Sequence, residues 1–176
     1  MDFSRVLETV GGFLEREGFA YAVAGAFGLQ AYGLARATYD LDLVAPAQAQ
    51  PKLLFFLESL GYETLHASAG YSNHVHSDPE LGRVDFVYVE GETSRRLFAG
   101  CKRTFSGGGR AIPVPRPEHL AAMKVQAMQN DPERTLQDMA DIGFLLRLPG
   151  VDEEEIRGYF ENAGLLERYH EIKRLS

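Results

Sequence analysis

The first half of the chain switches between apolar periodicities typical of helices and short apolar runs typical of strands. Residues 2–17 carry apolar side chains three and four positions apart, which predicts an amphipathic helix. The apolar run 21–24 and the β-prone run 83–89 predict buried strands. The apolar segment 51–60, with a proline at its start, predicts a further helix. Helices and strands in this order indicate an α/β or α+β sheet domain.

Shorter strands are expected between and after these elements. Residues 63–65 and 74–77 are predicted as strands around a turn at Gly70. Residues 111–114 are predicted as a last strand at a sheet edge, because a proline there cannot donate to a ladder. The glycines at 107–109 are not followed by a Lys-Ser/Thr pair, so they predict a hairpin tip and not a phosphate-binding loop.

The pattern becomes helical from residue 117 onward. Helices are predicted over 117–129, over 132–148 with Asp131 as N-cap, from Asp152 to Asn162, and over 165–175. The change of pattern predicts a core of residues 1–115 followed by a helical subdomain of residues 116–176.

Composition narrows the class of protein. The 176 residues, 45% of them hydrophobic, suffice for one domain with a real core. The apolar runs are too short to span a membrane, and the N-terminus lacks the basic start and apolar centre of a signal peptide. The single cysteine, Cys101, excludes an intramolecular disulfide and a cysteine-based zinc cluster. We therefore expect a cytoplasmic protein that does not enter membranes.

The net charge of −7 argues against nucleic-acid binding by the whole surface. A local exception is the segment 95–116, where no acidic residue interrupts the basic ones: Arg95, Arg96, Lys102, Arg103, Arg110 and Arg116. This segment could dock a polyanion such as RNA, and it could equally be a solvated loop that balances an acidic protein.

Residues 21–44 hold the chemistry around which the chain is organised. After the apolar run 21–24, Gly25 breaks the strand, and a short helix is expected over 26–32. The next predicted strand contains Asp40 and Asp42, whose side chains share one face because side chains alternate along a strand. Two like charges there repel each other unless a cation lies between them, although a solvent-facing edge strand would also tolerate them.

The glycine turn changes the balance between these alternatives. A strand, a glycine turn and a helix N-terminus form a site for an anion, because free N–H groups and the helix dipole point at it. A carboxylate pair beside an anion site is suited to a nucleoside triphosphate with its Mg²⁺ ions.

These residues resemble a known family. Gly25-Ala26, thirteen residues and then Asp40-Leu41-Asp42-Leu43 are similar to the signature of polymerase-β-like nucleotidyltransferases, and the run 33–43 is similar to that of the AbiEii/AbiGii toxin branch. The resemblance implies an α+β fold, a minimal nucleotidyltransferase core with a C-terminal helical bundle. One departure is Ala26, which offers no hydroxyl to a phosphate where the signature has Gly or Ser.

The resemblance also implies roles for single residues. Asp40 and Asp42 would bind two Mg²⁺ ions, and phosphate oxygens would be held by the backbone of the Gly25–Ala26 turn together with Arg36 and Thr38. Asp85 would be the third metal ligand. From the residues alone Asp85 is an acid near the start of the strand 83–89, either a surface residue or, with neighbouring strands about 4.8 Å apart, a partner of the other two acids.

Two residues of the helical part are further candidates. Lys124 lies inside an apolar run and shares a face with Leu120, so it either snorkels past the core edge or points into a charged cleft. Its similarity to a lysine of the toxin branch implies a contact with the triphosphate. Asp138 lies in a stretch similar to a motif of that branch, while its spacing from Arg134 also fits a helical salt bridge.

The resulting hypothesis is Mg²⁺-dependent transfer of a nucleoside monophosphate from an NTP to a hydroxyl on RNA, including tRNA, or on protein. The family implies a toxin with a cognate antitoxin as a further partner. The alternatives are a small-molecule acceptor, as in antibiotic-modifying relatives, a catalytically silent nucleotide-binding protein, and a structural module. His74 and His76 alternate on a predicted strand, but no Cys or third His lies nearby in sequence, so we expect them to be half-exposed structural residues.

Overall fold

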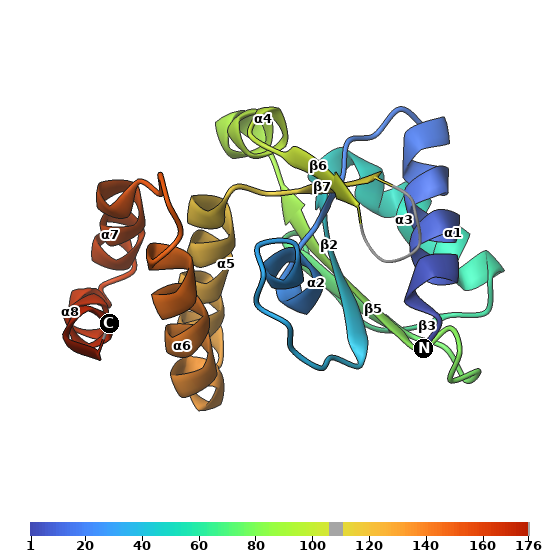
Figure 1. The fold of residues 1–176 in the computed structure, drawn as a ribbon. Coiled ribbons are helices and arrows are strands. Elements are labelled where there is room, and N and C mark those ends of the chain that lie inside the picture. The colour runs from blue at the N-terminus through green and yellow to red at the C-terminus, as the bar shows by residue number, and fades with distance from the viewer. Residues whose placement is uncertain (106–110, 176) are drawn as a thin grey trace. The chain divides into compact units, whose positions relative to one another are not determined.

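The computed structural model describes residues 1–105 and 111–175, and the chain divides into two compact units, Met1–Pro115 and Arg116–Ser176 (Figure 1). The prediction of a hairpin tip at 107–109 lies outside the described residues.

Unit 1 is built on a mixed sheet with the strand order β1–β2–β5–β4–β3. Its strands are β1 (Ala22–Val23), β2 (Asp40–Pro46), β3 (Glu63–Ala67), β4 (Tyr71–Val75) and β5 (Arg83–Val89). β2 and β5 are parallel, whereas β1, β4 and β3 each run antiparallel to a neighbour. A separate ladder pairs β6 (Lys102–Phe105) with β7 (Ala111–Val114). The predicted α+β fold with a mixed sheet is confirmed.

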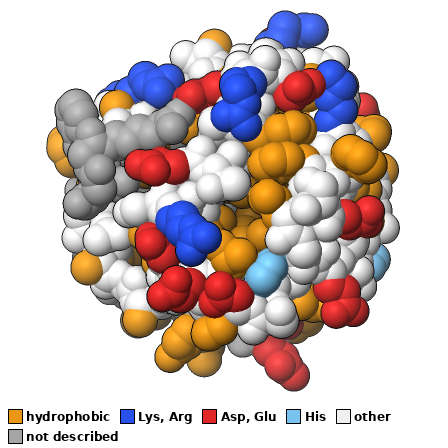
Figure 2. All heavy atoms as spheres, turned by 90° about the vertical axis from the view of Figure 1, so that its right-hand side faces the viewer, with side chains coloured by type: hydrophobic (Ala, Val, Ile, Leu, Met, Phe, Trp, Pro, Cys, Tyr) orange, Lys and Arg blue, Asp and Glu red, His pale blue; other side chains and the backbone are white. Residues whose placement is uncertain are grey.

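The helices of unit 1 are α1 (Phe3–Arg16), α2 (Gly25–Gln30), α3 (Gln50–Ser59) and α4 (Gly91–Ala99). α1 and α3 lie side by side, and the ring of Phe13 on α1 stacks on the ring of Phe56 on α3 with centroids 4.0 Å apart. Gly11 lies within α1, and a Cβ there would lie 2.7 Å from the Tyr21 hydroxyl oxygen, so glycine allows Tyr21 to pack closely against the helix. Figure 2 looks onto this side of the unit, where hydrophobic side chains gather between acidic and basic ones.

The central strands have one apolar face and one polar face, since side chains alternate along a strand. Leu41 and Leu43 of β2 and Val84 and Phe86 of β5 are fully buried in the core. The residues between them, which point to the opposite face, include the acids of both strands. This alternation therefore places the polar chemistry of β2 and β5 on one surface.

Several predicted elements are corrected by the structure. Residues 91–99 form the helix α4 and residues 102–105 form the strand β6, and neither element was predicted from the sequence. The predicted strand 74–77 begins earlier, at Tyr71, and ends at Val75. His74 is wholly buried and not half-exposed, because its ring hydrogen-bonds Thr64 Oγ1 at 3.0 Å and Ser72 Oγ at 2.8 Å. Burial lowers the pKa of this histidine.

Unit 2 is helical, as predicted, with α5 (Pro117–Asn130), the single-turn helix η2 (Pro132–Arg134), α6 (Thr135–Leu146), α7 (Glu153–Asn162) and α8 (Leu166–Leu175). Asp152 caps α7 by accepting from the Glu155 N–H at 3.0 Å, which confirms the predicted cap. The core of unit 2 contains Leu120, Val125, Ile142, Leu145, Ile156 and Phe160. Among the described residues, no helix is both long and apolar enough to cross a membrane.

Candidate active site

Three carboxylates converge where β2 and β5 pair. The parallel register sets Asp42 opposite Asp85 and Asp40 opposite Arg83. Cross-strand partners point to the same face, so the acids of the two strands become neighbours. One carboxylate oxygen of each of Asp40, Asp42 and Asp85 lies within 4.8 Å of the others.

Gly25 fixes the approach of the preceding turn to this cluster. Its φ of +53° lies in the left-handed region, which favours glycine. A Cβ at this position would lie 1.8 Å from Asp42 Oδ2, so a side chain has no space. The chain can therefore bring the start of α2 against the Asp42 carboxylate only because residue 25 is glycine.

Asp85 is the most enclosed of the three acids, with 6% of its surface exposed. Its Oδ1 accepts from Arg83 Nε at 2.9 Å, and its Oδ2 accepts from Arg83 Nη2 at 2.9 Å and from the Tyr71 hydroxyl at 2.8 Å. The hydrogen bond to Asp85 raises the pKa of Arg83. Burial, together with the bond to Asp85, raises the pKa of Tyr71 to about 12. Both donors therefore remain protonated near neutral pH and hold Asp85 in place.

The other predicted residues of unit 1 surround the turn before β2. The Thr38 hydroxyl donates to Asp40 Oδ1, so Thr38 orients a carboxylate of the cluster. Ala26 is buried in α2, and Arg36 is half-buried in the segment between α2 and β2. Their assignment to phosphate oxygens stays a prediction.

The donor set fits a divalent cation of the Mg²⁺ type. Carboxylate oxygens are the ligands that such hard cations prefer. On the far side of Asp85 the register places Asn73 of β4. Its carbonyl oxygen Oδ1 is buried and accepts no hydrogen bond from the described residues, which adds a further oxygen donor to the same face. The Arg83 guanidinium, bound to both oxygens of Asp85, shows in addition that this surface attracts positive charge.

Lys124 and Asp138 lie together in unit 2. The Lys124 ammonium nitrogen is 2.8 Å from Asp138 Oδ1 and 2.8 Å from Asp141 Oδ2, and Lys124 is only 7% exposed. Lys124 therefore does not snorkel to the surface: it joins α5 to α6 through two ion pairs. Its contact with the triphosphate, like that of Asp138, stays a prediction.

Two arginines of the basic segment 95–116 form ion pairs with acids of unit 1. Arg95 pairs with Glu92 at 2.5 Å on α4, and Arg103 lies 3.8 Å from Glu15. Arg116 belongs to unit 2. Arg110 lies outside the described residues.

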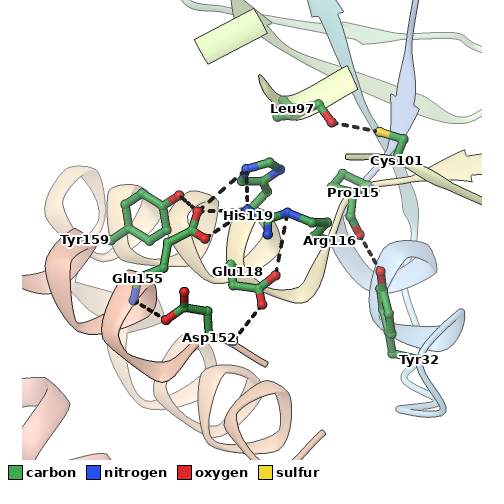
Figure 3. Close-up of polar contacts among 10 residues, drawn as sticks. All are labelled: Tyr32, Leu97, Cys101, Pro115, Arg116, Glu118, His119, Asp152, Glu155 and Tyr159. Atoms are coloured by element: carbon green, nitrogen blue, oxygen red, sulfur yellow. Dashed lines mark hydrogen bonds and ion pairs between the residues drawn. The ribbon is translucent and has the colours of Figure 1, made fainter. Parts of the chain in front are cut away.

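Arg116 takes part in a polar network at the start of unit 2 (Figure 3). Its Nη2 donates to both carboxylate oxygens of Glu155, at 3.0 and 2.9 Å, and the Tyr159 hydroxyl donates to Glu155 Oε1 at 2.6 Å. Buried Glu118 accepts from the Asp152 N–H at 2.8 Å. These contacts tie the start of α5 to α7, which is a structural role within unit 2.

Comparison with known proteins supports the fold. No protein-family model matches the chain, and no curated protein matches its sequence. Solved structures do match. The antibiotic-resistance factor ANT(2'')-Ia in solution has a TM-score of 0.66 and 14% identity, over 99% of this chain and 97% of that one. The lincomycin-bound lincosamide antibiotic adenylyltransferase LnuA has a TM-score of 0.57 and 17% identity, over 81% and 96%.

A third structure, an antigenic nucleotidyltransferase-like protein from Paracoccidioides brasiliensis, has a TM-score of 0.58 and 17% identity, over 98% of this chain and 91% of that one. At such identities the likeness shows the fold alone. The chain therefore has the fold of nucleotidyltransferases, as the resemblance implied, and its particular branch stays a prediction.

The residues around Asp85 were not predicted from the sequence. Arg83 could have been found, because it lies two residues before Asp85 and so shares its strand face. Tyr71 and Asn73 could not have been found, because their positions beside Asp85 depend on the register of β4 against β5. This strand was predicted to start only at residue 74.

Proposed function

We propose that this protein is a nucleotidyltransferase that moves a nucleoside monophosphate from an NTP to a hydroxyl acceptor. The observation that carries the proposal is the convergence of Asp40, Asp42 and Asp85 within 4.8 Å on one sheet face, beside a glycine turn that admits no side chain. The nucleotidyltransferase fold supports it independently.

The reaction would be an in-line displacement. The acceptor hydroxyl oxygen attacks the α-phosphorus, the bond from the α-phosphorus to its bridging oxygen breaks, and pyrophosphate leaves with that electron pair. Mg²⁺ bound by the three carboxylates would offset the triphosphate charge and lower the pKa of the attacking hydroxyl.

Each residue of the cluster has a separate task in this proposal. Asp40 and Asp42 hold cations, and Thr38 keeps the Asp40 carboxylate in position through its hydroxyl. Gly25 lets the turn approach the carboxylates closely enough for its backbone N–H groups to meet phosphate oxygens. Asp85, held by Arg83 and Tyr71, supplies an oriented third ligand. The hydroxyl proton passes to Asp85 or to bulk water.

A small hydroxyl-bearing molecule is the acceptor that the observations favour. ANT(2'')-Ia is an antibiotic-resistance factor, and LnuA is a lincosamide antibiotic adenylyltransferase. The match to this chain covers 97% of the first and 96% of the second. The pairing of Arg95, Arg103 and Arg116 with acids also weakens the case for a polyanion dock in the segment 95–116.

An RNA or protein acceptor, with the role of a toxin held by an antitoxin, is the second candidate. It rests on the similarity of residues 33–43 to the toxin branch. Growth arrest on expression, relieved by Asp40→Asn with Asp42→Asn, would support it, and normal growth counts against it.

The experiment is to incubate the protein with each α-³²P-labelled NTP and Mg²⁺, and to offer separate acceptor pools. The pools are total RNA, a protein extract, and small molecules including tobramycin and lincomycin, which are named in the neighbouring structures. Transfer that is lost in the double variant establishes the function, and the labelled pool gives the acceptor class. If no pool is labelled although MgATP raises the melting temperature, the protein binds nucleotides without transferring them. If neither occurs, the proposal fails.

A further inference from the structure

Tyr71 places a hydroxyl group of the protein itself against the acids of β2 and β5. Its oxygen lies 2.8 Å from Asp85 Oδ2, to which it donates a hydrogen bond. A hydroxyl that gives up its proton to a carboxylate must come within about 2.6–3.2 Å of it. Tyr71 therefore already occupies, relative to Asp85, the position that the acceptor hydroxyl of the proposed reaction has to reach.

The register of the sheet puts Tyr71 on the same face as the acids. Asn73 of β4 lies opposite Asp85, and Tyr71 lies two residues before Asn73 on the same strand. Because side chains alternate along a strand, Tyr71 shares the face of Asp85, which is also the face of its β2 partner Asp42. An NTP bound at the carboxylates would therefore meet a phenol on the same surface.

The backbone of Tyr71 is fixed beside a turn. Its carbonyl oxygen accepts from the Ser68 N–H at 2.8 Å and from the Ser68 hydroxyl at 3.2 Å. The ring is half-buried and has the ring of His66, an exposed residue of β3, as a neighbour, with centroids 6.3 Å apart. The hydroxyl can therefore change its position by rotation of the side chain, next to residues that are exposed to solvent.

We propose that Tyr71 is a site of self-nucleotidylation, at which the protein accepts a nucleoside monophosphate when no other acceptor is bound. The Tyr71 oxygen attacks the α-phosphorus of the NTP, and its proton passes to Asp85 Oδ2. The bond from the α-phosphorus to its bridging oxygen breaks, and pyrophosphate leaves with that electron pair. The product is a phosphodiester between Tyr71 and the nucleoside.

The proposed step needs no ionised tyrosine beforehand. A general base removes the proton while the new bond forms, so the hydroxyl enters the reaction protonated. The inference rests on the proposed function, since it takes Asp40, Asp42 and Asp85 as the site at which the NTP binds.

The modification should close the site to other acceptors. A nucleotidylated Tyr71 can no longer donate to Asp85, and its phosphate adds a negative charge beside the carboxylates. Protein that has first labelled itself should therefore transfer less to any external acceptor than protein that meets NTP and acceptor together.

The test is incubation of the protein with Mg²⁺ and each α-³²P-labelled NTP in the absence of an acceptor, followed by denaturing electrophoresis. The protein band should keep the label, and tandem mass spectrometry should find one added nucleoside monophosphate on Tyr71. The same NTP labelled at the γ-phosphate should leave no label, because that phosphate departs within the pyrophosphate. A band that keeps the γ-label would show phosphorylation and overturn the proposal.

Variants locate the reacting hydroxyl. Tyr71→Phe should lose the label, and so should Asp40→Asn with Asp42→Asn. The matched control is Tyr39→Phe, because Tyr39 directly precedes Asp40 but is 91% exposed, and this variant should label itself like the wild type. Label mapped to any residue other than Tyr71 in the wild type would overturn the proposal, whether or not Tyr71→Phe folds.

The product can be identified on protein freed of Mg²⁺ and nucleotide. Its ³¹P NMR spectrum should contain a phosphodiester signal, which a phosphodiesterase removes and a phosphomonoesterase leaves in place. A phosphomonoester signal would contradict the proposed bond.

Failure of this inference can be told apart from failure of the proposed function. If an external pool is labelled but the protein without an acceptor never labels itself, the proposed function stands and the inference fails. If neither the protein nor any pool is labelled, both fail.

Discussion

The two units each contain a cluster of acids with basic side chains beside it, yet the clusters differ in their surroundings. In unit 1, Asp40 and Asp42 are partly exposed, and the guanidinium of Arg83 bonds only Asp85 among the cluster's acids in the contacts described. In unit 2, Lys124 is buried with Asp138 and Asp141 and lies 2.8 Å from both.

This difference distinguishes a candidate cation site in unit 1 from structural ion pairs in unit 2. Buried charges are tolerated only when they are paired, so the acids of unit 2 depend on Lys124 for the stability of the fold. One carboxylate oxygen of each acid in unit 1 lies within 4.8 Å of the others, and like charges this close repel unless positive charge lies between them. In the proposed function, acids of the same type therefore bind a cation in unit 1, whereas in unit 2 they are paired within the fold.

The largest expected effect comes from removing the acids of unit 1. Asp40→Asn with Asp42→Asn should lower transfer by about 10³-fold or more, because the cation ligands are lost. Its free energy of unfolding should stay equal or rise by up to about 1 kcal/mol, since a repulsion is removed. Chemical denaturation beside the labelling assay checks both. A variant that unfolds instead would show that these acids belong to the structure.

The matching change in unit 2 is Lys124→Met. It removes the ammonium that lies 2.8 Å from both Asp138 and Asp141, so it should cost about 3–5 kcal/mol in the free energy of unfolding. Adding Asp138→Asn and Asp141→Asn should restore much of the loss. Lys52→Met, which breaks an exposed pair with Glu17, is the control and should cost less than about 1 kcal/mol.

Lys124→Met also tests the predicted contact with the triphosphate. If the variant stays folded and binds MgATP more weakly, Lys124 is a nucleotide ligand and the contrast between the units fails for this residue. Unchanged nucleotide affinity in the folded variant restricts Lys124 to its structural role.

Gly25→Ala should have an intermediate effect on catalysis. The new Cβ would displace Asp42 by overlapping its carboxylate, and a displacement of about 1 Å can cost about 10²-fold in rate. Gly33→Ala is the matched control. Its φ of +101° lies farther from the left-handed helical region than that of Gly25 and imposes at least as much backbone strain on alanine, but its Cβ would meet nothing within 4 Å. Steady-state kinetics should show a loss for Gly25→Ala only, and equal losses would trace the effect to strain.

The smallest effect concerns the apolar face of the same sheet. Burial lowers the pKa of His74, so the unfolded chain takes up a proton below about pH 6.5 that the native state resists. The contribution of His74 to stability is complete above about pH 6.5 and is lost as the pH falls through the lowered native pKa. Urea denaturation between pH 8 and 5.5 should therefore show a smaller acid loss in His74→Gln than in the wild type. His66→Gln, on the exposed strand β3, should keep the wild-type dependence.

The strongly patterned parts of the fold were predictable from the sequence. The β-prone run 83–89 matches the bounds of β5, Arg83–Val89. The pattern of residues 21–44 predicted the strand, turn, helix and strand that carry Asp40 and Asp42. α4 was missed because its sequence is rich in polar residues and its helical periodicity is carried by few apolar side chains, of which Leu97 is buried.

The contacts of the candidate site were less predictable. Tyr71 and Asn73 reach Asp85 through the register of β4 against β5, a long-range pairing that no local pattern encodes. The sequence did not decide whether Lys124 snorkels to the surface or points into a charged cleft. Only the packing of α6 on α5 brings Asp138 and Asp141 to its ammonium. Local periodicity thus assigned these residues to strands and helices, whereas their contacts depend on which strands and helices pack together in the tertiary structure.

The most direct test of the contrast between the two units is the broadening of amide NMR signals by substoichiometric Mn²⁺ in the nucleotide-free protein. We predict that the signals lost first belong to β2 and β5 around Asp40, Asp42 and Asp85, and that Asp40→Asn with Asp42→Asn abolishes this loss. Broadening centred on Lys124, Asp138 and Asp141 of unit 2, or uniform broadening in both proteins, would contradict the assignment of the cation site to unit 1.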